Sequence, residues 1–338
     1  MKKKINIVLN FIVFPSLAIL LLYLAFKGID LEKAWKELLK ADFRWVMISL
    51  VFALGGFFFR ALRWRLLLQA SNQNPPIRTT LYAVVVAYFA NIAIPRMGEV
   101  TRCATLKKTN DIPLDVSFGT VITERIIDFI TLLLIISTVL ILDFSFFSNF
   151  FWENALEPIV SQFSESKTPL LILVVFFLLI FAALLFFRKK IRRLSFVKKG
   201  MNFLKGLIKG LFSVFHLKQN GLFLLYTVFI WTCYILMTYV VFFALPSTSH
   251  LSFTDSLFVL SIGGLGMSAP VQNGFGAFHW IVSRGLMLFG VSQSDGLLYA
   301  TLCHESQTLM VLILGPITLL LLFLYNKIVY KYFISIYV

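Results

Sequence analysis

The stretch that decides the fold is residues 91–99, with the sequence NIAIPRMGE, because it interrupts an otherwise apolar region of the chain. A second interruption follows at residues 266–276, with the sequence GMSAPVQNGFG. In each, a proline ends an apolar run and a glycine follows within a few residues. Inside a bilayer, non-helical backbone is tolerated only where it is buried in protein or lines a wet cavity. Paired breaks in two halves of a chain therefore predict a transport site.

The composition around these breaks is that of an integral membrane protein. Of the 338 residues, 59% are hydrophobic and only 14% are charged, and the mean hydropathy is +0.86. A spanning helix needs about 20 apolar residues. We predict an all-α polytopic membrane helix bundle of about six to eight transmembrane helices, forming a single integral membrane domain over residues 1–338. The predicted spans are 5–26, 116–142, 170–187, 222–245 and 297–325, with a shorter one at 46–59.

The net charge of +15 is concentrated between residues 188 and 218, where ten Lys and Arg residues occur without an acidic one. This block separates two predicted spans, so we interpret it as a cytoplasmic loop that obeys the positive-inside rule. A specific site for lipid headgroups is the alternative, and nucleic acid is not expected as a partner. Counting the spans outward from this loop then places the N-terminus and the C-terminus in the cytoplasm.

Charge and parity also predict what the two breaks do. Both flanks of residues 79–98 belong on the cytoplasmic side, so this segment should enter the membrane and return as a re-entrant hairpin. Residues 256–288 should form a second re-entrant hairpin that enters from the opposite side. The halves 1–167 and 168–338 would then form an inverted repeat, with a long helix after each hairpin.

Polar residues at the first break are candidates for binding an anion. Arg96, Glu99 and Arg102 are spaced by three, so in a helix they share one face. A guanidinium group suits phosphate because its planar fork binds two oxygens, and Glu99 would either orient an arginine or carry a proton. The alternative is a salt-bridge cluster at a helix end. The candidate residues of this break are Asn91, Pro95, Arg96, Gly98, Glu99 and Arg102.

The long helix that follows carries Glu124, Arg125 and Asp128 inside a predicted span. Ionisable groups within a membrane are costly, and by default they are functional candidates. Glu124 and Asp128 would point the same way, and Arg125 is suited to pair with a carboxylate on a neighbouring helix. A purely structural ion pair is the alternative.

The second break is rich in glycine rather than arginine. Residues without side chains would let a substrate or a helix approach the backbone, and the helix that begins near residue 277 would aim free N–H groups at an anion. A tight helix crossing is the alternative. His304 and Glu305 are adjacent, so we do not expect them to face each other, and His304 would be a hydrogen-bonding group or a proton carrier. The candidates here are Pro270, Asn273, Gly274, Gly276, His279, His304 and Glu305.

Motifs of soluble catalysis are missing from the sequence. There is no phosphate-binding loop, no dinucleotide fingerprint and no nucleophile elbow. Cys103, Cys233 and Cys303 are too scattered for a disulfide framework or a zinc site. We therefore predict no catalytic residue, no metal and no other cofactor.

Four segments in order carry a family resemblance: FRALRW at 59–64, NIAIPRMGEVTR at 91–102, TERIID at 123–128 and PVQNGFGAF at 270–278. Together they resemble the lysylphosphatidylglycerol synthase transmembrane family, the flippase-like membrane domain of multiple peptide resistance factor and its stand-alone relatives. Relatives often carry Glu where this chain has His279. The resemblance implies a multi-pass protein of the bacterial inner membrane that handles phospholipids or other lipid-linked substrates.

Two functions follow as hypotheses. The first is a lipid translocase that moves an anionic or zwitterionic headgroup through a cavity between the two hairpins. The second is an integral-membrane transferase, or the membrane half of a synthase that works with a separate soluble synthase, in which Glu99, Glu124 or Asp128 would be the base. A scaffold that recruits a soluble enzyme through its basic loop is a third possibility.

Overall fold

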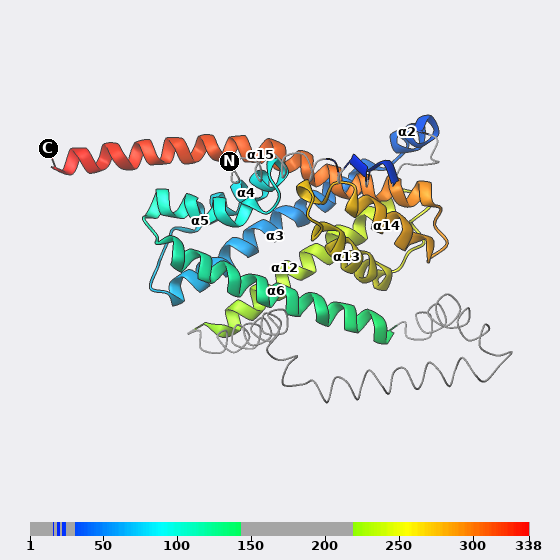
Figure 1. Ribbon diagram of the computed structural model, residues 1–338, viewed down its shortest axis with the longest axis horizontal. Helices are drawn as coiled ribbons and strands as arrows, with labels where there is room; N and C mark the ends of the chain where they lie inside the picture. The colour runs from blue at the N-terminus through cyan, green and yellow to red at the C-terminus, as the bar shows by residue number, and fades with distance from the viewer. Residues whose placement is uncertain (1–15, 17–18, 21, 25–30, 143–218, 338) are drawn as a thin grey trace, which may run out of the picture. The chain divides into compact units, whose positions relative to one another are not determined.

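All elements in the described part of the chain are helices (Figure 1). The structure is a computed structural model that describes residues 31–142 and 219–337 and a few residues between 16 and 24. The all-α prediction is confirmed. The elements are α2 (Leu31–Leu39), α3 (Phe43–Ala70), α4 (Ile77–Ala93), α5 (Met97–Asn110), α6 (Leu114–Leu142), α12 (Asn220–Val241), η2 (Phe242–Ala244), α13 (Phe253–Met267), η3 (Gln272–Gly274), α14 (Ala277–Met287) and α15 (Gln293–Tyr337).

Four helices are long and apolar enough to cross a membrane: Phe43–Ala70, Leu114–Leu142, Asn220–Ala244 and Gln293–Leu324. They confirm the predicted spans 116–142, 222–245 and 297–325. The short span at 46–59 was wrong in its end, because α3 continues for eleven residues beyond it. The predicted spans 5–26 and 170–187 and the basic loop 188–218 lie outside the described residues.

The surfaces of these helices have the character that a lipid environment requires. Large apolar side chains are exposed along α3, α12 and α15. Such a surface is normally covered by a partner protein or by lipid. Examples of these side chains are Met47, Val51, Val228, Ile313, Leu320 and Phe323. Together with the four helices of spanning length, this band establishes a multi-pass membrane protein.

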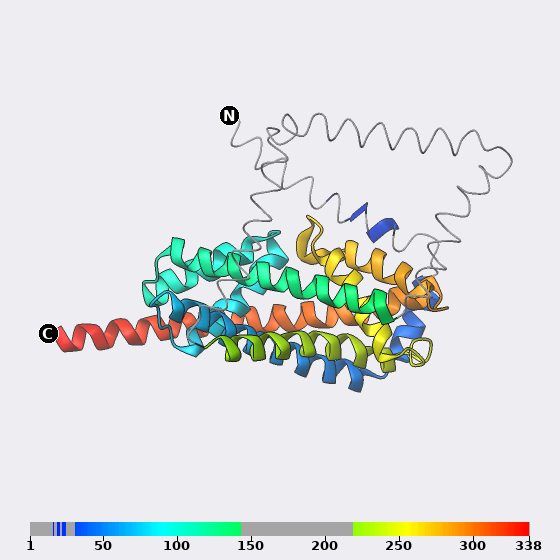
Figure 2. The same cartoon turned by 90° about the horizontal axis from the view of Figure 1, so that it is seen from below.

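The chain divides into two compact units, one formed by residues 1–125 and 217–338 and the other by residues 126–216. The first unit holds every contact described below. In it α3 packs along α12, so the N-terminal and C-terminal parts of the sequence lie side by side (Figure 2). The single domain and the inverted repeat remain predictions.

The first break joins α4 and α5, which pack against each other as a helical hairpin. Ile94 is extended and Arg96 has a φ of 60°, so the helix cannot continue through Pro95. The backbone N–H of Gly98 donates to Oδ1 of Asn91 at 2.7 Å. A Cβ at Gly98 would lie 2.5 Å from the carbonyl oxygen of Ala87, so only glycine allows the two helices to approach this closely. The break is thus a tight turn, and its re-entry from the cytoplasm remains a prediction.

The second break joins α13 and α14, which also form a packed hairpin. Ser252 and Asp255 form a capping box that starts α13. After Pro270 the chain turns through η3, where Asn273 and Gly274 both have positive φ. Asparagine and glycine are the residues that adopt this backbone conformation most readily. The turn places η3 against α4, and α14 packs on α15.

Candidate functional site

Glu124 is the centre of a buried group of charges. Its side chain is completely enclosed, and three arginines surround its carboxylate. Arg102 Nη1 lies 3.1 Å from Oε2, while Arg60 Nε and Arg63 Nη2 lie 3.5 and 3.6 Å from Oε1. All three arginines are at least nine-tenths buried. A carboxylate without water needs such partners, because the desolvation cost of a lone buried charge is several kcal/mol.

Three helices bring these charges together. Arg60 and Arg63 lie one turn apart on α3, Arg102 lies on α5, and Glu124 lies on α6. The indole N–H of Trp64 on α3 donates to Thr120 Oγ1 at 2.9 Å and so fastens α3 to α6.

A cation–π contact and a hydrogen bond hold two of the guanidinium groups in place. The guanidinium of Arg102 stacks over the Trp64 ring at 4.7 Å. Arg63 also donates to Thr227 on α12 at 3.2 Å. Four helices therefore share the cluster, which couples its geometry to the packing of the first unit.

A second, more exposed ion pair lies beside the first. Arg125 Nε is 3.2 Å from Glu99 Oε1, which confirms the prediction that Arg125 pairs with a carboxylate on another helix. Arg60 Nη1 donates to the hydroxyl of Tyr88 at 2.9 Å, and that hydroxyl is 3.4 Å from the hydroxyl of Tyr234. We call the set Arg60, Arg63, Arg102, Arg125, Glu99 and Glu124 the arginine cluster. Its arginines outnumber its glutamates by two.

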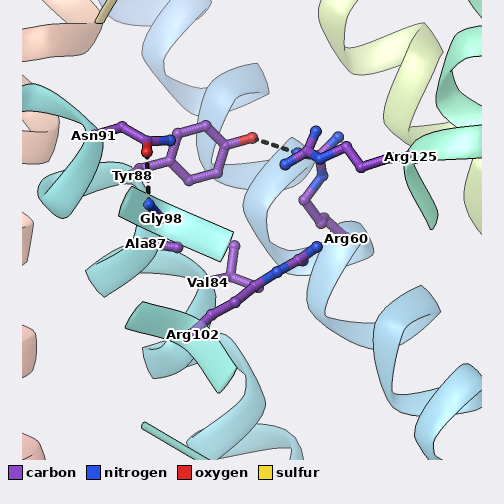
Figure 3. Close-up of a pocket in the computed structure, with 8 residues that line it drawn as sticks. All are labelled: Arg60, Val84, Ala87, Tyr88, Asn91, Gly98, Arg102 and Arg125. Carbon is purple, nitrogen blue, oxygen red and sulfur yellow. Dashed lines mark hydrogen bonds between the residues drawn. The ribbon is translucent and has the colours of Figure 1, made fainter. Parts of the chain in front are cut away.

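A small, partly open cavity lies over the arginine cluster, and residues from α3, α4, α5 and α6 line it (Figure 3). Three of the lining side chains are the arginines Arg60, Arg102 and Arg125, which Figure 3 shows converging from separate helices. The complete lining is Arg60, Val84, Ala87, Tyr88, Asn91, Gly98, Arg102 and Arg125. No carboxylate belongs to this lining, so the described wall is cationic.

Arg102, which lines this cavity, has donors without a partner in the described part of the chain. It is 2% exposed, and its Nε and Nη2 have no hydrogen-bond partner among the described residues. Leaving a buried charged donor unsatisfied costs about 1–3 kcal/mol or more. An anion with several oxygens would satisfy those donors, and phosphate matches the fork of a guanidinium. The chemistry of these donors therefore suits an oxyanion.

The residues predicted at the first break do not all meet. Gly98, Asn91 and Arg102 line the cavity, while Glu99 supports it through Arg125. The shared face of Arg96, Glu99 and Arg102 was wrong, because Arg96 precedes α5 in a left-handed conformation and points elsewhere. Pro95 lies in the turn beside it, and Asp128 belongs to the other compact unit.

Arg60, Arg63 and Tyr88 were missed as site residues. The predicted span 46–59 ended just before Arg60, so both arginines fell outside it. Two arginines one turn apart, next to Trp64 and followed by Leu66, Leu67 and Leu68, were the available signal. Charges flanked by apolar residues on both sides belong inside a helix rather than at its end.

The candidates of the second half form a separate group. His304 Nδ1 lies 2.8 Å from Glu305 Oε1, and His279 Nε2 lies 3.3 Å from the same oxygen. His304 Nε2 is 2.7 Å from the carbonyl oxygen of Asn273, whose side chain donates to Thr308 at 3.0 Å. The expectation that His304 and Glu305 do not face each other was wrong: the glutamate is long enough to fold back to its neighbour. Pro270, Gly274 and Gly276 shape the turn.

The two breaks meet in the folded chain. Arg96 Nη2 donates to the backbone carbonyl of Ser268 at 3.2 Å, and α4 contacts η3. The first hairpin therefore touches the second at the points where both lose helical backbone. This contact links the halves through exposed atoms rather than through the core.

These features define a multi-pass helical membrane protein with a cationic cavity lined by α3, the α4–α5 hairpin and α6, and not, as predicted, a cavity between the two hairpins. The family described as the lysylphosphatidylglycerol synthase TM region matches residues 7–315, and the chain belongs to this family. Membership links the protein to lipid modification or translocation. No curated protein and no solved structure matches the chain.

Proposed function

We propose that the protein binds the phosphate of a lipid headgroup in the arginine-lined cavity and moves that lipid across the membrane. The observation that carries the proposal is the cavity wall, where Arg60, Arg102 and Arg125 converge without a carboxylate among the lining residues. Arg102, one of the lining residues, has two buried donors without a partner among the described residues. A phosphate in the cavity would satisfy them and balance the excess of arginine.

The location of the cavity favours a lipid over a free anion. Its lining includes residues of α3 and α6, both of spanning length. The same helices expose large apolar side chains such as Val51 and Leu134. A headgroup in the cavity could therefore keep its acyl chains in the surrounding hydrocarbon. In the predicted orientation, with both termini in the cytoplasm of a bacterial cell, the membrane would be the inner one.

The transferase alternative is less well supported by the geometry. It needs a base within reach of the bound lipid. Glu124 is fully enclosed and is not part of the cavity lining. Glu99 is paired with Arg125 and is not part of the cavity lining either. A separate soluble synthase could supply a modified lipid to this chain, in keeping with the family description.

The test is lipid transfer between leaflets in reconstituted vesicles. Vesicles carry the purified protein and a trace of headgroup-bearing, fluorescent phosphatidylglycerol, and a membrane-impermeant reductant bleaches the outer leaflet. Loss of the protected inner fraction then measures translocation. We expect the wild type to accelerate that loss, and Glu99→Gln/Arg125→Gln to slow it by at least about tenfold, since a charge-assisted phosphate contact contributes about 1.5–3 kcal/mol.

The double variant removes both members of one ion pair, so neither charge is left alone. Arg44→Gln is the matched control, because Arg44 lies on α3 but its side chain is 89% exposed. It should translocate lipid at the wild-type rate. A fluorescent lipid without phosphate should be transferred slowly by all three proteins. Equal rates in wild-type and protein-free vesicles across phospholipids would refute the proposal, as would a double variant as fast as the wild type.

A further inference from the structure

The second hairpin holds a compact group of nitrogen and oxygen ligands that the lipid cavity does not use. His279 on α14 and His304 and Glu305 on α15 each turn one ligand atom towards a common point, and these atoms lie within 4.8 Å of one another. The two imidazole rings are 2% and 5% exposed, while the Glu305 side chain is 30% exposed. The site is thus buried on its histidine side and reachable from its carboxylate side.

The donors and acceptors of this group do not match unless a cation, either a proton or a metal ion, is added. A carbonyl oxygen only accepts, so His304 Nε2, at 2.7 Å from the Asn273 carbonyl, must carry the hydrogen. In a neutral imidazole the other nitrogen, Nδ1, then carries only a lone pair. It lies 2.8 Å from Glu305 Oε1, and an ionised carboxylate also only accepts. Either a proton or a metal ion must occupy the space between these lone pairs.

We propose that this group is a binding site for a divalent transition metal, with Zn²⁺ as the best match. Two imidazole nitrogens and one carboxylate oxygen are a known zinc ligand set that leaves a fourth position open. Zinc ligands at about 2.0–2.2 Å from a tetrahedral ion lie about 3.3 Å from each other. The separation between His279 Nε2 and Glu305 Oε1 is 3.3 Å. The separation between His304 Nδ1 and that oxygen is 2.8 Å, so the carboxylate would have to move outward to bind the ion.

The surroundings of His304 fit the same assignment. Histidines that bind metals usually donate their second N–H to a carbonyl or a carboxylate, which fixes the ring and its tautomer. His304 does so through the carbonyl of Asn273. Asn273 in turn donates from its side chain to Thr308 on α15. The metal would therefore hold α14 and α15 together and, through His304, fix the η3 turn. Because the Glu305 side chain is 30% exposed, water could complete the shell at the fourth position.

The test is zinc binding by the full chain, purified in detergent and stripped with a chelator. Calorimetry gives the affinity, and elemental analysis after dialysis gives the zinc content. We expect about one zinc ion per chain. Glu305→Gln, which keeps the shape of the side chain, and His279→Gln should each weaken binding by at least about 100-fold, since loss of an outer partner alone costs 10–100-fold. His250→Gln is the matched control, because His250 is exposed in the loop before α13, and it should bind zinc normally.

Cobalt provides a readout that does not depend on the variants. Co²⁺ bound by the wild type should give the strong visible absorption of a four-coordinate ion, whereas weak six-coordinate absorption would contradict the site. The proposal is overturned if the wild type binds no zinc, or if Glu305→Gln and His279→Gln bind it as the wild type does. This site is independent of lipid binding. The Glu99→Gln/Arg125→Gln protein should keep its zinc, so either proposal can fail alone.

Discussion

Replacing Glu124 by glutamine should be among the most destabilising conservative substitutions in the described part of this protein. The substitution keeps the shape of the side chain but removes the carboxylate that Arg60, Arg63 and Arg102 share at 3.1 to 3.6 Å. Removing one partner of a buried ion pair costs about 3–5 kcal/mol. Because three guanidinium groups lose their common counter-charge, we expect about 5 kcal/mol, the upper end of this range.

Thermal unfolding in detergent with a thiol-reactive dye measures this effect directly. Cys103, Cys233 and Cys303 are all buried and free, so the dye reports unfolding. The expected loss lowers the melting temperature by on the order of 10 °C. Glu99→Gln is the matched comparison, since its pair with Arg125 has side chains 29% and 45% exposed and should contribute about 1 kcal/mol or less.

The reasoning is refuted if Glu124→Gln and Glu99→Gln melt within about 2 °C of each other. A third protein checks the cause. Adding Arg102→Met to Glu124→Gln removes one of the cations that lost its counter-charge, and it should recover part of the melting temperature. A further loss in the double variant would instead indicate that packing, and not charge, explains the effect.

Three further predictions concern other parts of the first unit. Gly98→Ala should destabilise the protein by about 1–3 kcal/mol, because the added methyl carbon would lie 2.5 Å from a carbonyl oxygen of α4. Gly119→Ala is the control: nothing lies within 4 Å of its added carbon, so it should be neutral or stabilising in the same melting assay. Ser252→Ala should cost about 1 kcal/mol by removing the cap of α13, seen as faster amide hydrogen exchange in its first turn. The hydrogen bond from Lys107 holds the pKa of Asp111 below its usual 3.8. This pair therefore adds stability at a pH above 3.8, and the protein loses that stability as the pH falls through the lowered pKa. Lys107→Gln should move the pKa of the Asp111 carboxyl, followed by NMR, back up towards 3.8.

Much of the fold could be predicted from the sequence because a bilayer imposes simple rules. Long apolar runs predicted α6, α12 and the spanning part of α15, Gln293–Leu324, to within a few residues. Pro95 and Pro270 marked both hairpin turns. The same rules failed at Arg60 and Arg63. A charged residue usually indicates that a span has ended. Here, however, Glu124 neutralises part of the charge of both arginines, and it lies on a helix more than 60 residues later in the sequence. Hydropathy has no term for such a distant partner.

The candidate site was predictable in its parts but not in its assembly. The sequence indicated Arg102, Glu124 and Arg125 as costly charges within a membrane, and the structure brings them together. It could not place His279 beside Glu305, because that contact depends on how α14 packs on α15. We expected no contact between His304 and Glu305 because neighbouring residues on a helix point in different directions. That expectation neglected the length of the glutamate side chain, which lets it fold back to its neighbour.

The excess of arginine over glutamate in the arginine cluster has an electrical consequence. Moving one elementary charge across a membrane potential changes its energy by about 2.3 kcal/mol per 100 mV. Four of the six cluster residues lie on α3 and α6, which are of spanning length. An empty cavity would therefore present net positive charge to that field, and a bound phosphate would cancel much of it. The loaded and empty protein should therefore respond differently to voltage. In the proposed translocation, the step that carries lipid would then be nearly neutral. The return of the empty protein would be driven, or opposed, by the membrane potential.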